Sequence, residues 1–423
     1  MRPFAVDAVV FLAALVGAGG LVEPAFADQP VPRKIVQVRS ASAPPLGAPP
    51  AMTQEDIARS EAALQELVEL RRQRALAIPP GTGAPPTLRS TPTHAGQAPA
   101  MGSPRVVAAP GDFTVFRNTI LTDAFTNNST SSTNEPSLGM NCETILYSGN
   151  WYASVSADGG RNFTFVDPAT TFPSFSGGFC CDQVVYFEET RGLMFWYLQY
   201  ARDGNGNNTL LLAWSTSNAA TQNNVWTYFT LSPQADYGYG NGVWFDFPDV
   251  SVSNNYVYFS TDVIGASENA LVLKMQLDDA TDGGGVSLSG YFSDYPFQRP
   301  THGAGGTMYV GAHKSMSEMR LYTWAEADAS PGSSVDRGVD AWLGGTYSAP
   351  SPDGTDYLNF GIPSLLAAWV ADGKVGFMWD SVQGDGFPWP NVRFAVFNEG
   401  GLGLADQGQI WNDDYAFAYP SVH

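Results

Sequence analysis

The stretch Gly177-Gly178-Phe179-Cys180-Cys181-Asp182-Gln183-Val184-Val185 runs from a glycine turn into β-branched residues, so it predicts the start of a β-strand. The same residue pattern recurs along the chain. In each copy a Pro or polar residue precedes a small or acidic residue, and aliphatic residues follow in every copy except the one at Arg299. The spacing of roughly 45 to 65 residues predicts a tandem repeat. The other copies are Asn134-Glu135-Pro136-Ser137-Leu138, Phe247-Pro248-Asp249-Val250, Arg299-Pro300-Thr301, Ile362-Pro363-Ser364-Leu365 and Tyr419-Pro420-Ser421-Val422.

Each repeat contains several short apolar runs separated by turns rich in Gly, Asn and Asp, as antiparallel hairpins require. Residues 183–187, 193–200, 209–215 and 225–231 form the clearest set of four predicted strands. Four-stranded antiparallel units in tandem predict an all-β fold, a β-propeller, because radial repetition protects the sheet edges. We predict six blades, with five as the alternative. The sixth would combine residues 113–120 with the copy at 419–423; otherwise the ring is open.

The first 27 residues have the pattern of a secretory signal peptide. Arg2 supplies a basic start, residues 9–16 are apolar, and Ala25-Phe26-Ala27 is a small-x-small cleavage site. The apolar run is shorter than the ~20 residues that a membrane span needs. We therefore expect a secreted protein, extracellular or periplasmic, with no membrane span.

Residues 28–104 are predicted to be a linker, because the beginning and the end of this region are both rich in Pro and Ala. Within it, residues 53–76 predict one helix, with a capping residue at Thr53 and basic residues in the last turns. Either this helix is solvated within a flexible arm, or its narrow apolar stripe docks on another surface. Residues 105–423 are the predicted propeller domain.

The chain is strongly acidic, with 21 Lys and Arg against 41 Asp and Glu. From Pro104 onward there are 12 basic and 33 acidic residues, a charge that disfavours binding to nucleic acid. No phosphate-binding loop, dinucleotide fingerprint or G-x-S-x-G motif is present in the sequence. The histidines are far apart in the sequence, so they are only weak evidence for a metal site. We therefore expect no cofactor, no bound metal and a monomeric chain.

Ser156-Ala157-Asp158-Gly159-Gly160-Arg161-Asn162-Phe163 matches the Asp-box pattern S-x-D-x-G-x-x-W/F. On this octet and the repeats, residues 113–423 resemble the Asp-box (BNR repeat) β-propellers, which include the sialidases. The resemblance implies that the octet is a structural hairpin turn at the edge of a blade. Sialidases also carry an F/Y-R-I-P motif whose arginine binds the substrate carboxylate. Phe116-Arg117-Asn118-Thr119 keeps only its aromatic residue and its arginine, which makes Arg117 a candidate ligand residue.

Three cysteines are present: Cys142, Cys180 and Cys181. In an exported protein, two of them should form a disulfide and one should be left over. We favour a bond between the adjacent Cys180 and Cys181, which would stiffen the turn beside Asp182. The alternative pairs Cys142 with either of them as a staple between blades.

Propeller ligands usually meet the starts of the inner strands around the central channel, so the repeated motif gives the candidate site. Carboxylates together with an arginine and a histidine suit acid–base chemistry on a sugar, and equally suit plain hydrogen bonding. We expect either a carbohydrate-active enzyme, a glycoside hydrolase or polysaccharide lyase, or a non-catalytic propeller that binds a glycan or a protein. The candidate catalytic residues are Asp182, Glu135 and Asp249, and the candidate substrate-binding residues are Arg299, His302, Gln183, Asn134, Arg117 and Asp246.

Overall fold

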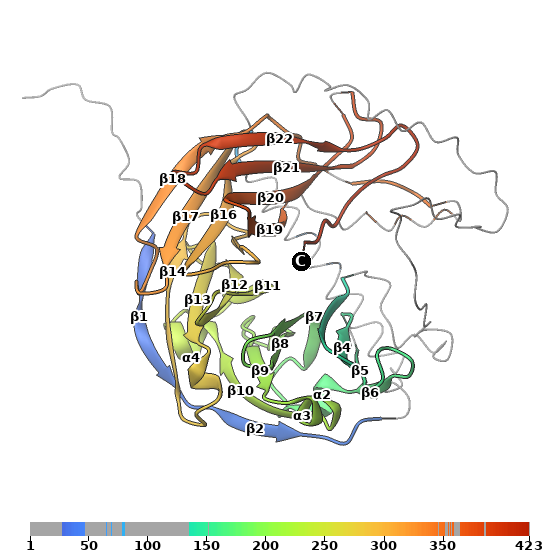
Figure 1. Cartoon of the computed structure of the whole chain (residues 1–423), viewed down its shortest axis with the longest axis vertical. Helices are drawn as coiled ribbons and strands as arrows, with labels where there is room; N and C mark the ends of the chain where they lie inside the picture. The colour runs from blue at the N-terminus through green and yellow to red at the C-terminus, as the bar shows by residue number, and fades with distance from the viewer. Residues whose placement is uncertain are drawn as a thin grey trace, which may run out of the picture.

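A computed structural model shows an all-β chain folded as a β-propeller. Five antiparallel sheets follow one another in chain order along an arc, and the first strand of each lies nearest the centre (Figure 1). We call these sheets blades 1 to 5. The structure describes residues 28–46, 65, 69, 78–80, 135–150, 152–345, 347–351, 354, 356, 358, 364–384 and 386–422.

From the centre outward, the strands of each blade pair with their neighbours in chain order. Blade 1 contains β3 (Ser137–Asn141), β4 (Thr144–Ser148), β5 (Ala153–Ser156) and β6 (Thr164–Val166). Blade 2 contains β7 (Phe179–Glu188), β8 (Leu193–Tyr200), β9 (Leu210–Ser215) and β10 (Val225–Leu231). Blade 3 contains β11 (Trp244–Val252), β12 (Tyr256–Ile264), β13 (Ala270–Gln276) and β14 (Val286–Ser293).

Blade 4 contains β15 (Arg299–Pro300), β16 (Thr307–Ser315), β17 (Glu318–Ala325) and β18 (Ser333–Gly338). Blade 5 contains β19 (Leu365–Ala371), β20 (Lys374–Ser381), β21 (Asn391–Asn398) and β22 (Leu404–Ile410). Four single helical turns lie in the connections between the described strands of the blades: α2 (Pro168–Thr171), α3 (Asn218–Gln222), α4 (Pro233–Tyr237) and the 3₁₀ turn η2 (Asp278–Ala280).

The core lies between the blades. Strand β8 is buried along its whole length because both faces of its sheet are covered, which explains its almost uninterrupted apolar sequence. One apolar cluster joins blades 2 and 3, where the rings of Tyr197 and Phe259 meet edge to face at 5.8 Å. Similar clusters join blades 1 and 2, blades 3 and 4, and blades 4 and 5. Each blade is therefore stabilised by its neighbours rather than by a core of its own.

Residues 28–46 are not a linker, which corrects the sequence-based interpretation of this part of the chain. Strand β1 (Gln29–Val36) pairs with β14 of blade 3, and β2 (Arg39–Ser42) pairs with β10 of blade 2, so each blade gains a fifth, outer strand (Figure 1). Leu46 then exchanges two backbone hydrogen bonds with Phe165 of blade 1. We call residues 28–46 the strap.

The strap is packed as well as paired. Val31 and Val36 are each 7% exposed and belong to the cluster between blades 2 and 3. Lys34 forms an ion pair with Asp236. At the start of the strap, the carboxylate of Asp28 accepts a hydrogen bond from the hydroxyl of Tyr322 in blade 4 at 3.0 Å. The strap therefore contacts four consecutive blades.

Most of the predicted helix at 53–76 lies outside the described residues. Gln65 and Glu69 are described, and both are helical and exposed. Beyond the predicted helix, Ile78 is 3% exposed and packs into the cluster between blades 4 and 5. The carbonyl of Pro79 accepts a hydrogen bond from the Met316 amide at 2.8 Å. This part of the predicted linker is therefore also attached to the propeller.

The structure describes five blades, and the predicted sixth is not confirmed. Residues 113–120, which would contribute to it, lie outside the described residues. Residues 419–422 are described, but they form no strand. They lie instead at the centre of the arc, where the C-terminus is marked in Figure 1.

The Asp-box octet forms a tight hairpin turn. The carboxylate of Asp158 accepts hydrogen bonds from the backbone amides of Arg161 and Asn162, both at 2.9 Å, and these bonds help to lower the pKa of Asp158 to about 2. Gly159 and Gly160 both have positive φ, which a glycine adopts without strain. The turn connects β5 and β6, away from the centre, as a structural role requires.

His313 in β16 creates a pH dependence of stability. It is 3% exposed, lies between the rings of Trp342 and Trp379, and neither ring nitrogen has a hydrogen-bond partner among the described residues. Burial lowers the pKa of His313 to about 3. The unfolded chain therefore binds a proton near pH 6.5 that the folded chain does not, and stability falls as pH drops below 6.5.

We expect His313→Phe to remove this loss. At pH 5 the histidine should cost about 2 kcal/mol relative to pH 7. Denaturant unfolding of both proteins at pH 7 and pH 5 should show a smaller decrease for the variant by about that amount. An identical pH dependence in the two proteins would show that His313 is not held neutral.

Candidate functional site

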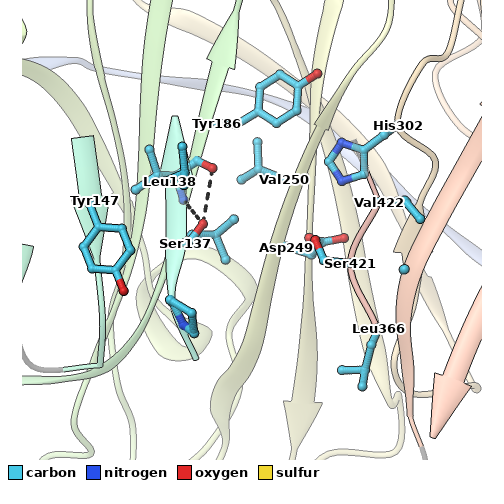
Figure 2. A pocket seen from close by; sticks show the side chains of 14 residues that line it. Ser137, Leu138, Tyr147, Tyr186, Asp249, Val250, His302, Leu366, Ser421 and Val422 are labelled. Atoms are coloured by element: carbon cyan, nitrogen blue, oxygen red, sulfur yellow. Dashed lines mark hydrogen bonds between the residues drawn. The ribbon is translucent and has the colours of Figure 1, made fainter. Parts of the chain in front are cut away.

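A pocket of about 350 Å³ lies at the centre of the arc (Figure 2). It is lined by residues from the inner strands of blades 1, 2, 3 and 5, from β4 in blade 1, from the turn after β15 in blade 4, and from the C-terminal segment. Its walls combine aliphatic side chains with two tyrosines, a histidine and a single carboxylate. The lining residues are Pro136, Ser137, Leu138, Tyr147, Val184, Val185, Tyr186, Asp249, Val250, His302, Leu366, Ala367, Ser421 and Val422.

Asp249 is the carboxylate of this pocket, and it forms an ion pair with Arg299. The Nη1 of Arg299 lies 3.3 Å from Oδ2 of Asp249. Arg299 is only 7% exposed; its Nε donates to the carbonyl of Leu365 at 2.8 Å, and its guanidinium lies 4.2 Å from the ring centre of Phe247. The guanidinium thus has protein partners on three sides. We interpret Arg299 as a residue that positions Asp249 and joins blades 3, 4 and 5.

His302 and Tyr186 form an aromatic surface at the pocket. Their ring centres are 5.5 Å apart and the ring planes are 19° from parallel. The His302 backbone is fixed by two hydrogen bonds to blade 5, with Ala368 and Val370. Burial raises the pKa of Tyr186, and the nearby Glu188 carboxylate adds to this, so its hydroxyl stays protonated. Figure 2 shows both rings beside the space that Asp249 also faces.

Glu135 and Asp182 come from neighbouring blades and share one hydrogen-bond donor. The side-chain amide nitrogen of Asn150 lies 2.7 Å from Oε2 of Glu135 and 3.5 Å from Oδ1 of Asp182. The two carboxylate oxygens can therefore be no farther apart than the sum of these distances. Asp182 is 7% exposed, whereas Glu135 is half-buried.

Neither acid of this pair lines the central pocket itself, but each is close in sequence to a residue that does. Glu135 directly precedes Pro136, and Asp182 comes two residues before Val184, both of which line the pocket. The carbonyl oxygen of the Asn150 side chain is buried and has no hydrogen-bond partner among the described residues. A buried acceptor without a partner calls for an explanation, and a bound ligand or water would provide one.

Register shifts within two inner strands place Asp182 and Asp249. In β7 the pairing register with β8 shifts between Phe179 and Gln183, and in β11 the register with β12 shifts between Asp246 and Asp249. Within these shifts, Cys181 and Phe247 have φ values of 70° and 58°, an unusual conformation for residues other than glycine. Such bulges re-aim side chains, and they are common beside functional sites.

The cysteine prediction is confirmed, because Cys180 and Cys181 are bonded to each other and Cys142 is free and exposed. The bonded pair is buried against Trp244 and Ile264 of blade 3. It lies inside the β7 bulge, directly before Asp182.

Alkylation without reduction should therefore label Cys142 alone. Because Cys142 is exposed, we expect labelling of the native protein, without prior unfolding. Peptide mapping after iodoacetamide treatment checks this. A disulfide-linked peptide containing Cys142 would contradict it.

Gln183 holds two blades together. Its side-chain nitrogen donates to the carbonyls of Gly149 and Tyr152 in blade 1, and its side-chain oxygen accepts from the indole of Trp196 at 2.9 Å. Its hydrogen bonds are thus made within the protein. Gln183 therefore stays outside the proposed set of ligand contacts.

The remaining predicted residues fall outside the pocket or outside the described chain. Asp246 is 1% exposed, is paired in register with Asp262 of β12, and does not line the pocket. Asn134 and Arg117 lie outside the described residues. The sequence pattern did not indicate Asn150 or Tyr186 as site residues. Tyr186 sits in a strand as any core residue would, and Asn150 resembles an ordinary turn residue.

Comparison with known proteins gives structural likeness alone. No family model and no curated protein matches the sequence. The fold is similar to a subtype N10 neuraminidase-like protein of A/little yellow-shouldered bat/Guatemala/060/2010, with a TM-score of 0.38 and 7% identity over 67% of this chain and 84% of the other. It is also similar to a GH43 β-1,3-galactosidase, with a TM-score of 0.35 and 11% identity over 68% and 96%.

An α-L-arabinofuranosidase from Fusarium graminearum is similar at a TM-score of 0.36 and 9% identity, over 68% of this chain and 82% of the other. At such scores and identities the likeness does not bear on activity. Among the described residues, no helix is long and apolar enough to cross a membrane. The same residues contain no group of three or more His, Cys, Asp or Glu side chains that could hold a metal ion.

Proposed function

We propose that this protein is a carbohydrate-active propeller, a glycoside hydrolase or polysaccharide lyase, that works at the central pocket. One observation carries the proposal: Glu135 and Asp182, from two blades, meet at one amide beside a pocket lined by all five blades. Two carboxyl groups close together at a sugar-sized pocket are the arrangement that glycosidic bond cleavage uses.

Asp182 is our first candidate for proton transfer. It is held by the disulfide turn and by Asn150, and catalytic groups need fixed geometry. Glu135 is more exposed, so it is better placed to activate a water molecule or to contact the leaving group. Asp249, fixed by Arg299, would orient the sugar through its hydroxyl groups.

The pocket walls fit a sugar ring. Tyr147, Tyr186 and His302 offer aromatic surface against which the C–H side of a sugar can pack, while Asp249 offers hydrogen-bond acceptors. The volume of about 350 Å³ lies at the small end of the usual range for ligand sites. We therefore propose that the pocket takes one or two sugar units.

The charges of the pocket favour an uncharged sugar. Among its described lining residues, the only group with a fixed charge is Asp249, and Arg299 neutralises it. A uronate or sialate would bring a second carboxylate to this place with no free cation among the lining residues to receive it. Neutral glycans should therefore bind better than acidic ones.

A panel of neutral and acidic oligosaccharides tests the proposal by calorimetry and by release of reducing ends. We expect binding of neutral glycans, and loss of that binding in Tyr186→Ala. Tyr239→Ala is the control, since Tyr239 is also half-buried but bonds to Glu268 away from the pocket. If no glycan binds, the proposal is wrong. If glycans bind without turnover, the protein is the non-catalytic glycan-binding propeller.

A further inference from the structure

The C-terminal segment is fastened to blade 5 before it reaches the pocket. The ring of Trp411 packs edge to face on Phe387 with centres 5.3 Å apart. The indole of Trp389 donates to the carbonyl of Asp413 at 3.0 Å, and the Phe417 amide donates to the carbonyl of Pro390 at 3.0 Å. These contacts hold residues 411–417 against residues 387–390 of blade 5.

The last fastening is made by Asp380 of β20, which is completely buried. The backbone amide of Tyr419 donates to both of its carboxylate oxygens, at 3.1 and 3.2 Å. Tyr419 has a φ of 56°, an unusual value for a residue other than glycine, at the turn that sends the chain into the pocket. Two residues later, Ser421 and Val422 line the pocket.

Burying a carboxyl group costs free energy, which an apolar residue at the same position would avoid. Asp380 forms no ion pair with a described residue, and burial raises its pKa well above the usual range, an effect that the Tyr419 amide only partly offsets. Its visible hydrogen bonds go to the C-terminal segment. The role of Asp380 therefore lies outside its own blade, in its hydrogen bonds to the C-terminal segment.

We infer that Asp380 is a positioning residue that holds residues 419–422 as a fixed wall of the central pocket, so that the pocket admits only the end of a glycan chain. This inference deepens the proposed function and rests on it for the nature of the ligand. The wall itself can be tested without any sugar.

The test measures how quickly iodoacetamide reaches a cysteine placed in the pocket by Leu366→Cys, in a Cys142→Ser background. Leu366 lines the pocket and is half-buried. Tyr419→Pro removes the donating amide and forbids a positive φ, without touching the core of a blade. We expect it to raise the alkylation rate at least tenfold. Tyr419→Gly, which keeps the amide and accepts the positive φ, should react at the parent rate.

Variants at Asp380 then assign the effect to the carboxyl group. Asp380→Ala should react as fast as Tyr419→Pro, and Asp380→Asn, which keeps an acceptor for the amide, should restore the slow rate. Asp262→Ala is the matched control, because Asp262 is 2% exposed and accepts the Phe297 amide at 2.7 Å, but the residues directly after Phe297, unlike those after Tyr419, do not line the pocket. It should leave the rate unchanged.

Val422→Ala completes the test. It should raise the alkylation rate in the parent protein and have no further effect when combined with Tyr419→Pro. Equal rates for Tyr419→Pro and Tyr419→Gly would overturn the inference, and so would acceleration by Asp262→Ala as large as that by Asp380→Ala.

If the protein binds glycans, the Tyr419→Pro variant should also bind internal segments of a glycan chain, which the parent protein rejects. Absence of any glycan binding would remove the proposed function but leave the alkylation result standing.

Discussion

Deletion of the strap, residues 28–46, is expected to lower the free energy of unfolding by several kcal/mol. The strap adds a fifth strand to two blades and buries Val31 and Val36 between them. Full burial of a valine contributes about 1.5–3 kcal/mol, and the lost strand pairing adds to this. Denaturant unfolding of the deleted and complete proteins measures the difference.

Two neighbouring residues of β1 provide a matched control for the strap. Val36 is 7% exposed and Ile35 is 71% exposed, because successive side chains of a strand point to opposite faces. We expect Val36→Ala to cost about 1–2 kcal/mol and Ile35→Ala less than about 0.5 kcal/mol. An unchanged melting temperature after strap deletion would show that the propeller is stable without it.

Asp182→Asn is expected to reduce turnover by about 10²- to 10⁴-fold while leaving glycan affinity nearly unchanged. The amide keeps the size of the carboxyl group but cannot exchange a proton at working pH, and acid–base groups contribute about this factor. Turnover and binding are measured on the same glycan, so that loss of the fold is not mistaken for loss of chemistry.

The control for Asp182 is Asp158→Asn in the Asp-box turn, which lies between β5 and β6 away from the pocket. It should change turnover less than about twofold, because it is neither acid nor base in the proposed reaction. Full turnover by Asp182→Asn would remove Asp182 from the mechanism. An equal loss in both variants would indicate that the substitutions act through folding.

The propeller was predictable because its signal is repeated. Middle strands such as β8 are almost uninterrupted apolar runs that end at turns with Gly, Asn and Asp, so their boundaries are clear in the sequence. The strap was missed because Pro30 and Pro32 argue against a strand. An outer strand tolerates proline, since the amide that it lacks can face away from the sheet.

Only those site residues that belong to the repeated motif could be predicted from the sequence. The repeated motif indicated Glu135, Asp182 and Asp249, but it did not show that Arg299 is occupied by protein partners. Nor did it show that Asn150 bridges two acids. Those contacts depend on bulges and on packing between blades, which residue spacing does not encode.

A crystal structure of the protein soaked with a neutral oligosaccharide selected from the panel would show whether the central pocket is the glycan site. We expect a sugar ring in the central pocket, against Tyr186 and His302, with a hydroxyl group bonded to Asp249 and the glycosidic oxygen toward Glu135 and Asp182. A sugar bound elsewhere on the propeller, with the central pocket empty at saturating concentration, would contradict it.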